Sequence, residues 1–251
     1  MTTSPGINVQ GQHHIGGLLL FDVNLHVPAG QWTCLLGRSG VGKSTILRLV
    51  LGLETGGKFT GNYGASDGMP LAGRISYMAQ SDLLLPWLSV LENVCVGARL
   101  RGERPDVDLA KDLLNSVGLS AHADQKPNTL SGGMRQRAAL ARTLFENCPI
   151  VFLDEPFSAL DAGTRADMQE LAALVLKGRT VLLVTHDPAE ATRLGHKITV
   201  LSEQGAQDWP VPPTLALRAI NDPQTLDCQA RLLDYWRGFG ARTCVISFRP
   251  L

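Results

Sequence analysis

The sequence has no excess of charge of either sign and no cysteines at the spacing of a metal site. Lysine plus arginine and aspartate plus glutamate number 23 each, so no net field favours binding to nucleic acid or to an anionic membrane surface. The 5 cysteines form no CxxC pair, and their odd number argues against a closed disulfide framework. This pattern favours reduced cysteines that serve mainly in packing, as in a cytosolic protein.

Long apolar runs are also missing. No run reaches the ~18 residues that a membrane-spanning helix needs. The start "MTTSPGINVQGQHHIGG" lacks the basic region, apolar core and cleavage site of a secretion signal. We therefore expect a protein that is soluble by itself and reaches a membrane only through a partner. Its 44% hydrophobic and 18% charged residues are an ordinary globular composition, with room for one large α/β domain or two small ones.

What the sequence does contain is a series of short apolar runs with helical patterns between them. The run "QWTCLLG" (31–37) ends in glycine, and apolar residues at helical spacing follow it over 43–53. Further runs, "RISYMAQ", "IVFLDE", "TVLLVTH" and "KITVL", are rich in β-branched and aliphatic residues. Strands that alternate with helices predict an α/β fold with a mostly parallel, buried sheet.

The strand signal fades over residues 81–147, where leucine-rich helical segments dominate. We predict a single domain over 1–251, with an α/β core at 1–80 and 148–205 and an inserted helical subdomain at 81–147. Residues 206–251 are predicted to be a C-terminal extension. It begins as a proline-rich loop and then has one apolar helix face, made of Leu226, Ala230, Leu233 and Trp236.

Residues 37–44 read "GRSGVGKS" and fit the phosphate-loop pattern GxxxxGK(S/T). The pattern follows a predicted strand and opens a predicted helix, which is the context that it requires. Its glycines let backbone N–H groups converge on phosphate oxygens, its lysine bridges the β- and γ-phosphates, and its serine offers a hydroxyl to Mg²⁺. The alternative is a glycine turn without a nucleotide. The predicted ATP contacts in this loop are Gly37, Ser39, Gly40, Gly42, Lys43, Ser44 and Thr45.

Polar side chains follow three of the predicted strands. In "IVFLDEP", Asp154 is expected to hold Mg²⁺ and Glu155 to orient or deprotonate the attacking water, because parallel strands deliver ligands at their carboxyl ends. His186 and Gln80 end two other strands, so they point to the same edge, and the Gln80 amide can bind Mg²⁺ and water without adding charge. The alternatives are acids that cap a helix, a structural histidine and a surface glutamine.

A second helix start of the anion-binding kind lies at "LSGGMRQR" (130–137). Ser131 is the expected cap, and Gly132 and Gly133 expose backbone N–H groups. This segment has no lysine at the phosphate-loop position, so it could not hold ATP unaided. Unless it is an ordinary glycine-led helix start, it needs a nucleotide that is held elsewhere.

In this order, the phosphate loop, Gln80, "LSGGMRQR", "VFLDEP", "SALD" and His186 resemble the ATP-binding cassette (ABC) ATPases over residues 18–201. The resemblance implies a P-loop NTPase core with an antiparallel β part near the N-terminus. It also implies a head-to-tail dimer in which Ser131, Gly132 and Gly133 bind the γ-phosphate of ATP held by the other subunit. His186 would clamp the γ-phosphate, and residues 158–161, with Asp161, would form the loop that crosses the dimer.

The sequence departs from the family's pattern at the position that stacks on adenine. The family usually stacks the base on an aromatic residue ahead of the first core strands, whereas "GQHHIGG" offers His14 or Ile15. We predict His14, because imidazole is planar.

The stretch "QSDLLLPWLSVLENV" resembles importers of the nitrate, sulfonate, taurine and pyrimidine-precursor group, although "LSEQGAQDWP" lacks the arginine, proline and glycine often found there. We expect a cytoplasmic ATPase subunit, a homodimer with ATP and Mg²⁺ as cofactors. It would lie on the inner face of the membrane through permease subunits, with a solute-binding protein as indirect partner and no nucleic acid. The alternatives are a soluble ABC protein acting on nucleic acid and a P-loop kinase or GTPase.

The apolar run Leu83, Leu84, Leu85 and Trp87 lies either in the core or in a groove for the permease.

Overall fold

The computed structural model describes residues 4–243, and side chains up to residue 236. A six-stranded sheet runs through the molecule in the order β5-β6-β7-β3-β8-β9. All neighbours in it are parallel except β9, which pairs antiparallel with β8. Every residue of β3, β6 and β7 is buried, because these aliphatic runs are covered on both faces. The strands are β3 (Trp32–Gly37), β5 (Ile75–Met78), β6 (Ile150–Asp154), β7 (Thr180–Thr185), β8 (Lys197–Ser202) and β9 (Gly205–Trp209).

A second, antiparallel sheet has the order β2-β1-β4, with β1 at Ile7–Ile15, β2 at Leu18–Val27 and β4 at Lys58–Ala65. Burial alternates along β1 and β2, so one face of the sheet packs on the core. Gly11 and Gly61 lie opposite each other, and a Cβ on Gly11 would lie 2.4 Å from the Thr60 carbonyl oxygen, so the close approach of β1 and β4 requires glycine. The predicted α/β fold with an antiparallel part near the N-terminus is confirmed.

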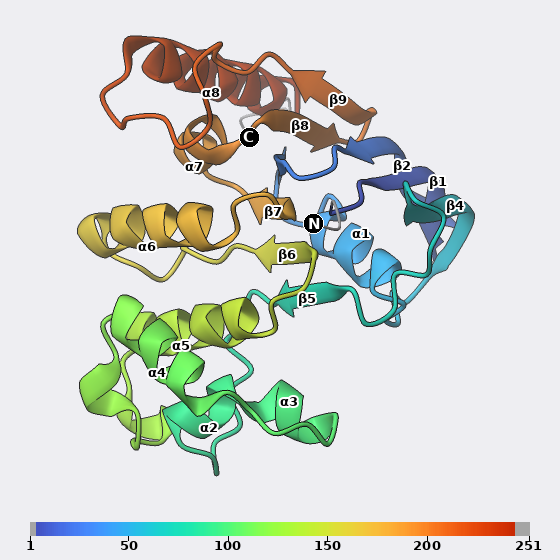
Figure 1. Cartoon of the computed structure of the whole chain (residues 1–251). Helices are drawn as coiled ribbons and strands as arrows, with labels where there is room; N and C mark the ends of the chain where they lie inside the picture. Colours follow the sequence, from blue (N-terminus) through green and yellow to red (C-terminus); the bar gives the residue numbers. More distant parts are fainter. Residues whose placement is uncertain (1–3, 244–251) are drawn as a thin grey trace, which may run out of the picture.

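Helices connect the strands of the main sheet. Helix α1 (Lys43–Val50) follows β3, α6 (Ala162–Val175) follows β6, and α7 (Pro188–Leu194) follows β7. In Figure 1, α6 lies beside the arrowhead ends of β6 and β7, and α7 and the C-terminal helix α8 (Pro223–Thr243) lie above them next to β8 and β9. The carboxyl ends of the parallel strands therefore meet at one edge of the sheet.

In the segment between β5 and β6 the regular elements are all helices, joined by loops. It contains α2 (Val90–Val94), α3 (Val96–Leu100), α4 (Val107–Ser116) and α5 (Gly132–Phe145), with short 3₁₀ turns at Ser120–His122 and Pro127–Thr129. Ser89 and Glu92 form a capping box that starts α2, and the Asp106 carboxylate caps α4. Figure 1 shows these helices below β5, at the opposite end of the molecule from β9.

The C-terminal segment forms a helix, α8 (Pro223–Thr243), but its apolar face differs from the predicted one. Leu226 and Leu233 are 47% and 39% exposed, whereas Cys228 and Leu232 are 0% and 2% exposed. The predicted face was wrong because β9 joins the main sheet and, with α7, fixes which side of α8 is covered. Within residues 4–243, no helix is both long and apolar enough to cross a membrane.

Candidate active site

The phosphate loop lies between β3 and α1. Gly40 and Gly42 have φ values of 84° and 103°, in the left-handed region where only glycine is unstrained. A Cβ on Gly42 would also lie 2.6 Å from Cδ1 of Phe21. The Lys43 ammonium is folded over the loop and donates to the carbonyl oxygens of Gly37 (2.7 Å) and Arg38 (3.0 Å). Burial lowers the pKa of Lys43, and the carboxylates of Glu155 and Asp154 oppose that shift.

Ser44, the next residue of α1, faces Asp154 at the end of β6. Asp154 is only 3% exposed, and burial raises the pKa of its carboxyl, while hydrogen bonds from Ser44 and Tyr77 lower it. One carboxylate oxygen, Oδ1, is buried without a hydrogen-bond partner. A buried carboxylate with an unsatisfied oxygen beside a serine hydroxyl fits a hard cation such as Mg²⁺, because such ions take oxygen ligands. Tyr77, which the motifs did not identify, supports this carboxylate from β5, and burial raises its own pKa to about 12.

The side chain of Glu155 lies where residues from the carboxyl ends of β5, β6 and β7 meet. Its Oε2 accepts from Nε2 of Gln80 at 3.2 Å, and its Oε1 lies 3.1 Å from Nδ1 of His186. Gln80 follows β5, Glu155 follows β6 and His186 follows β7, so residues separated by more than a hundred positions meet at one carboxylate. The backbone of Glu155 is left-handed, with φ of 50°, which is strained for a residue with a side chain.

Two backbone hydrogen bonds hold that strained residue in place. The Glu155 N–H donates to the carbonyl oxygen of Val184 at 2.9 Å. The carbonyl oxygen of Glu155 accepts from Nε2 of Gln136 at 3.1 Å, and Gln136 is itself buried. Gln136 belongs to the "LSGGMRQR" helix, α5, so this helix is attached directly to the end of β6. The motif pattern alone could not show this contact, because it depends on how α5 packs against the strand.

Ser131 and Asp161 both begin helices that open toward solvent. The Ser131 hydroxyl accepts from the Met134 N–H at 3.3 Å, and the Asp161 carboxylate accepts from the Thr164 N–H at 3.0 Å, which lowers the pKa of Asp161. Ser131, Gly132 and Asp161 are exposed, and Gly133 is half-buried against the backbone of Ala159. Among residues 4–243, no hydrogen bond or ion pair joins residues 131–133 to the phosphate loop of the same chain.

The two histidines near the end of β1 have different environments. His13 is fully buried, bonds Oγ1 of Thr55 at 2.9 Å and lies against Phe21, with 5.3 Å between the ring centroids. Burial lowers the pKa of His13. His14 is half-buried and lies opposite Leu19 of β2, after a register shift between the two histidines. Of the two rings, His13 is therefore fixed inside the sheet, and His14 is the one with access to solvent.

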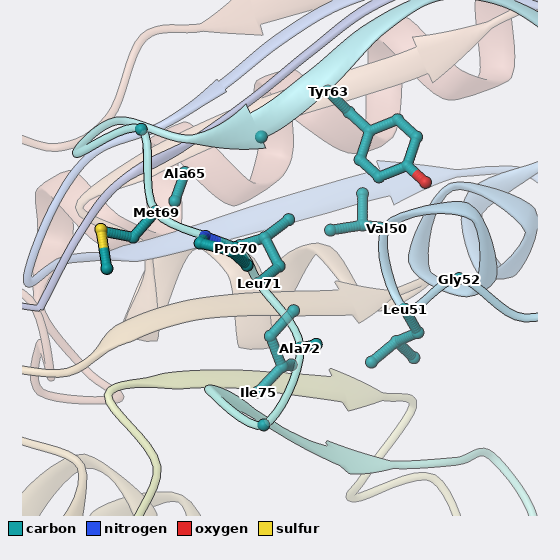
Figure 2. A pocket seen from close by; sticks show the side chains of 13 residues that line it. Val50, Leu51, Gly52, Tyr63, Ala65, Met69, Pro70, Leu71, Ala72 and Ile75 are labelled. Carbon is teal, nitrogen blue, oxygen red and sulfur yellow. The ribbon is translucent and has the colours of Figure 1, made fainter.

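A hollow of about 640 Å³ lies away from these residues, between the end of α1, β4 and the loop before β5. Figure 2 shows Tyr63, Val50, Leu71 and Ile75 directed toward it. Among the described side chains, residues 4–236, its lining contains no carboxylate, histidine or lysine. This hollow therefore offers neither a carboxylate or imidazole base nor a cation for a phosphate, and the candidate active site is the edge where the phosphate loop, Asp154 and Glu155 meet.

Comparison with known proteins identifies the family. The model of the ABC transporter family matches residues 20–158. An aliphatic sulfonates import ATP-binding protein of Agrobacterium fabrum is 47% identical over 76% of this chain and 72% of its own length. Another of the same name, from Rhodococcus jostii, is 43% identical over 89% of each chain. A solved dimeric ATP-binding cassette in a post-hydrolysis state, bound to ADP and Pi, superposes with a TM-score of 0.69 at 30% identity, covering 85% of this chain and 99% of that one. The chain belongs to the ABC transporter family, as an ATP-binding subunit that hydrolyses ATP.

Proposed function

We propose that this subunit powers a bacterial importer, and that Glu155 is the base that activates water for ATP hydrolysis. The observation that supports this role is the convergence of Gln80 and His186 on the two oxygens of one carboxylate. Gln80 donates a hydrogen bond to one oxygen and the His186 ring lies against the other, so the two neighbours fix the carboxylate in one orientation. Glu155 would take a proton from the water whose oxygen bonds to the γ-phosphorus, while the bond from that phosphorus to the β–γ bridging oxygen breaks, so that ADP and inorganic phosphate are the products.

The remaining residues of the site bind and position. Lys43 would turn from the carbonyl oxygens of its own loop to the β- and γ-phosphates, where its charge offsets theirs. Ser44, Asp154 and Gln80 would hold Mg²⁺, which when bound neutralises charge on the phosphates. His186, with its side chain 56% exposed, has ring surface left to contact the γ-phosphate while Nδ1 stays on Glu155.

The second anion-binding helix start would serve the ATP of a partner subunit. Ser131 and Gly132 are exposed and have no bond to the phosphate loop of their own chain, so they are free to meet a second copy. Asp161, at the start of α6, would lie in the loop that crosses between the two subunits. We propose a homodimer with one ATP bound at each composite site, because each chain carries both halves of the site and neither half is complete alone.

The importer assignment rests on relatives whose names say that they import aliphatic sulfonates. The apolar run after Gln80 supports a membrane partner as well. Leu84 is 8% exposed and lies in the core, whereas Leu83 and Trp87 are 61% and 66% exposed. We propose that these exposed side chains contact a permease, so that the subunit works at the inner face of the membrane, and that a solute-binding protein supplies that permease.

The substitution Glu155→Gln tests the proposed catalytic role. The amide keeps the shape of the side chain but cannot accept the proton, so we expect ATP to bind with unchanged affinity and turnover to fall by about 10²-fold or more. Calorimetry measures the affinity, and phosphate release measures the rate. In size-exclusion chromatography with ATP and Mg²⁺, this variant should elute as a dimer. Hydrolysis near the wild-type rate would show that Glu155 is not the base.

A further inference from the structure

A second hollow, of about 770 Å³, directly adjoins the phosphate loop. Residues 38–41 of the loop form one wall, the start of β2 forms another, and the turn between β8 and β9 forms a third. The last wall comes from the far end of the sequence, at Trp236 of α8. The C-terminal helix thus reaches the nucleotide-binding edge of the molecule, although no motif in its sequence indicates it.

The position of this hollow suits the nucleoside half of a nucleotide. Ser39 and Gly40 belong both to the hollow and to the phosphate loop, so a ligand anchored by its phosphates has this space next to it. Leu19, on the β2 wall, is 51% exposed and lies opposite His14 in the β1–β2 ladder. The hollow therefore extends from the phosphates toward the stretch where the base is expected.

A purine has two apolar faces, and proteins commonly bind it by stacking an aromatic ring on one of them. Among the residues whose side chains the structure describes, up to 236, Trp236 is the only aromatic one that lines the hollow. His13 is unsuited to this role, because its ring is fully buried and bonded to Thr55. The hollow therefore has one flat aromatic surface, and α8 provides it.

The packing of α8 holds Trp236 in position. Cys228 and Leu232, two turns and one turn earlier, are buried, and Trp236 itself is partly buried against the main core. The preceding residue, Tyr235, packs its ring on Trp209 of β9, with 4.9 Å between the centroids. The side chain is thus anchored on one side by the core and borders the hollow on the other, which is the arrangement of a preorganised stacking surface.

We propose that Trp236 stacks on the adenine of ATP, so that the C-terminal helix is part of the nucleotide site. The proposal rests on the phosphate loop being the ATP site, and it assigns the base contact to the C-terminal extension in addition to β1. Trp236 would select ligands by ring stacking, which favours planar bases. It would make no contribution to phosphate binding.

The test compares two variants of the full chain, Trp236→Phe and Trp236→Leu, which both keep apolar bulk while only the first keeps a ring. Calorimetry in Mg²⁺ measures binding of ADP and of inorganic pyrophosphate. We expect Trp236→Leu to weaken ADP binding about tenfold, Trp236→Phe to weaken it much less, and pyrophosphate to bind all three proteins equally. Trp87→Leu, at an exposed tryptophan away from the hollow, should bind ADP like the wild type.

Fluorescence gives an independent measurement. ADP should quench tryptophan emission in the wild type and in Trp87→Phe, and the quenching should disappear in Trp236→Phe. Equal ADP affinity in the Leu and Phe variants would overturn the stacking proposal, as would a parallel loss of pyrophosphate binding, which would indicate general disruption. If the wild type binds neither ADP nor pyrophosphate, the phosphate-loop assignment fails first, and the proposal fails with it.

Discussion

Asp154 and Glu155 are neighbours in the chain, yet their surroundings suit them to different tasks. Asp154 is almost fully buried and keeps one oxygen without a partner, which suits a carboxylate that awaits a cation. Glu155 has a polar neighbour at each oxygen, Gln80 and His186, and a backbone fixed in a strained conformation, which suits a base held in a fixed position. The difference arises because β6 ends between them, so that one side chain stays inside the sheet edge and the next is turned out by a positive φ.

Glu190 is a buried carboxyl one turn after His186, and we expect it to make the free energy of unfolding depend on pH. It is 4% exposed, and burial raises its pKa to about 7, although a hydrogen bond from the Thr185 hydroxyl at 2.7 Å opposes the shift. Asp187 also raises this pKa, while Arg165 and His186 lower it. Because the raised pKa belongs to an acid, the folded state holds its proton in a pH range where the unfolded chain has already lost it.

This difference in proton binding fixes the direction of the pH dependence. Glu190 should not change the free energy of unfolding below about pH 4.5, where its carboxyl is protonated in both the folded and the unfolded state. As the pH rises from there toward about 7, the free energy of unfolding should fall, by at most about 3 kcal/mol. In Glu190→Gln this dependence should be absent, because the amide still accepts from Thr185 but does not titrate. Urea unfolding at a series of pH values measures it. Identical slopes for the two proteins between pH 5 and 7 would contradict the assignment.

The loop after Gln80 is held by its polar residues, while its apolar residues face in two directions. Asn93 of α2 is fully buried and donates through Nδ2 to the carbonyl oxygens of Leu85 (3.1 Å) and Ser89 (2.9 Å). From α5, Arg135 pairs with the Asp82 carboxylate at 2.9 Å. The loop therefore has a fixed shape, and the exposure of Trp87 is a property of that shape.

The substitution Trp87→Asp should separate hydrolysis from transport. Its exposed side chain supports neither the core nor the ATP site, so we expect normal folding and ATP turnover in the isolated subunit. Uptake in vesicles reconstituted with the permease should fall about tenfold or more, as for a residue central to an interface. The matched control is Leu84→Asp, which buries a charge in the core and should prevent folding. Full uptake by Trp87→Asp would rule out the contact.

At the level of elements, the sequence predicts what depends on local pattern. The strand runs, the glycine loop and the polar residues at strand ends are local features, and the structure has each strand where its run predicted it. The buried face of α8 depends on β9 and α7, and the contact of Gln136 with Glu155 depends on the packing of α5. Similarly, the sequence offers His14 or Ile15 for the base, and only the pairing of β1 with β2 shows that His14 is half-buried while Ile15 is 41% exposed.

For the whole molecule, the central proposal is that one chain carries two incomplete phosphate sites. The phosphate loop has the lysine and lies next to Asp154 and Glu155, whereas the helix start at Ser131 is exposed and, among residues 4–243, has no hydrogen bond to that loop. A dimer in which each exposed helix start covers the partner's loop would complete both sites. Hydrolysis should therefore depend on association, and a stable monomer should bind ATP without turning it over.

The most direct test of this account mixes two inactive variants. Ser131→Arg places a bulky positive side chain at the helix start of α5, and Lys43→Ala removes the lysine of the phosphate loop. Each homodimer should therefore be inactive. A mixed dimer would contain one site with both an intact phosphate loop and an intact helix start. We expect mixed dimers that are purified through two tags and confirmed by mass to recover up to about half of the wild-type hydrolysis rate. Mixed dimers that form but stay inactive, or a monomer that hydrolyses ATP at the wild-type rate, would contradict it.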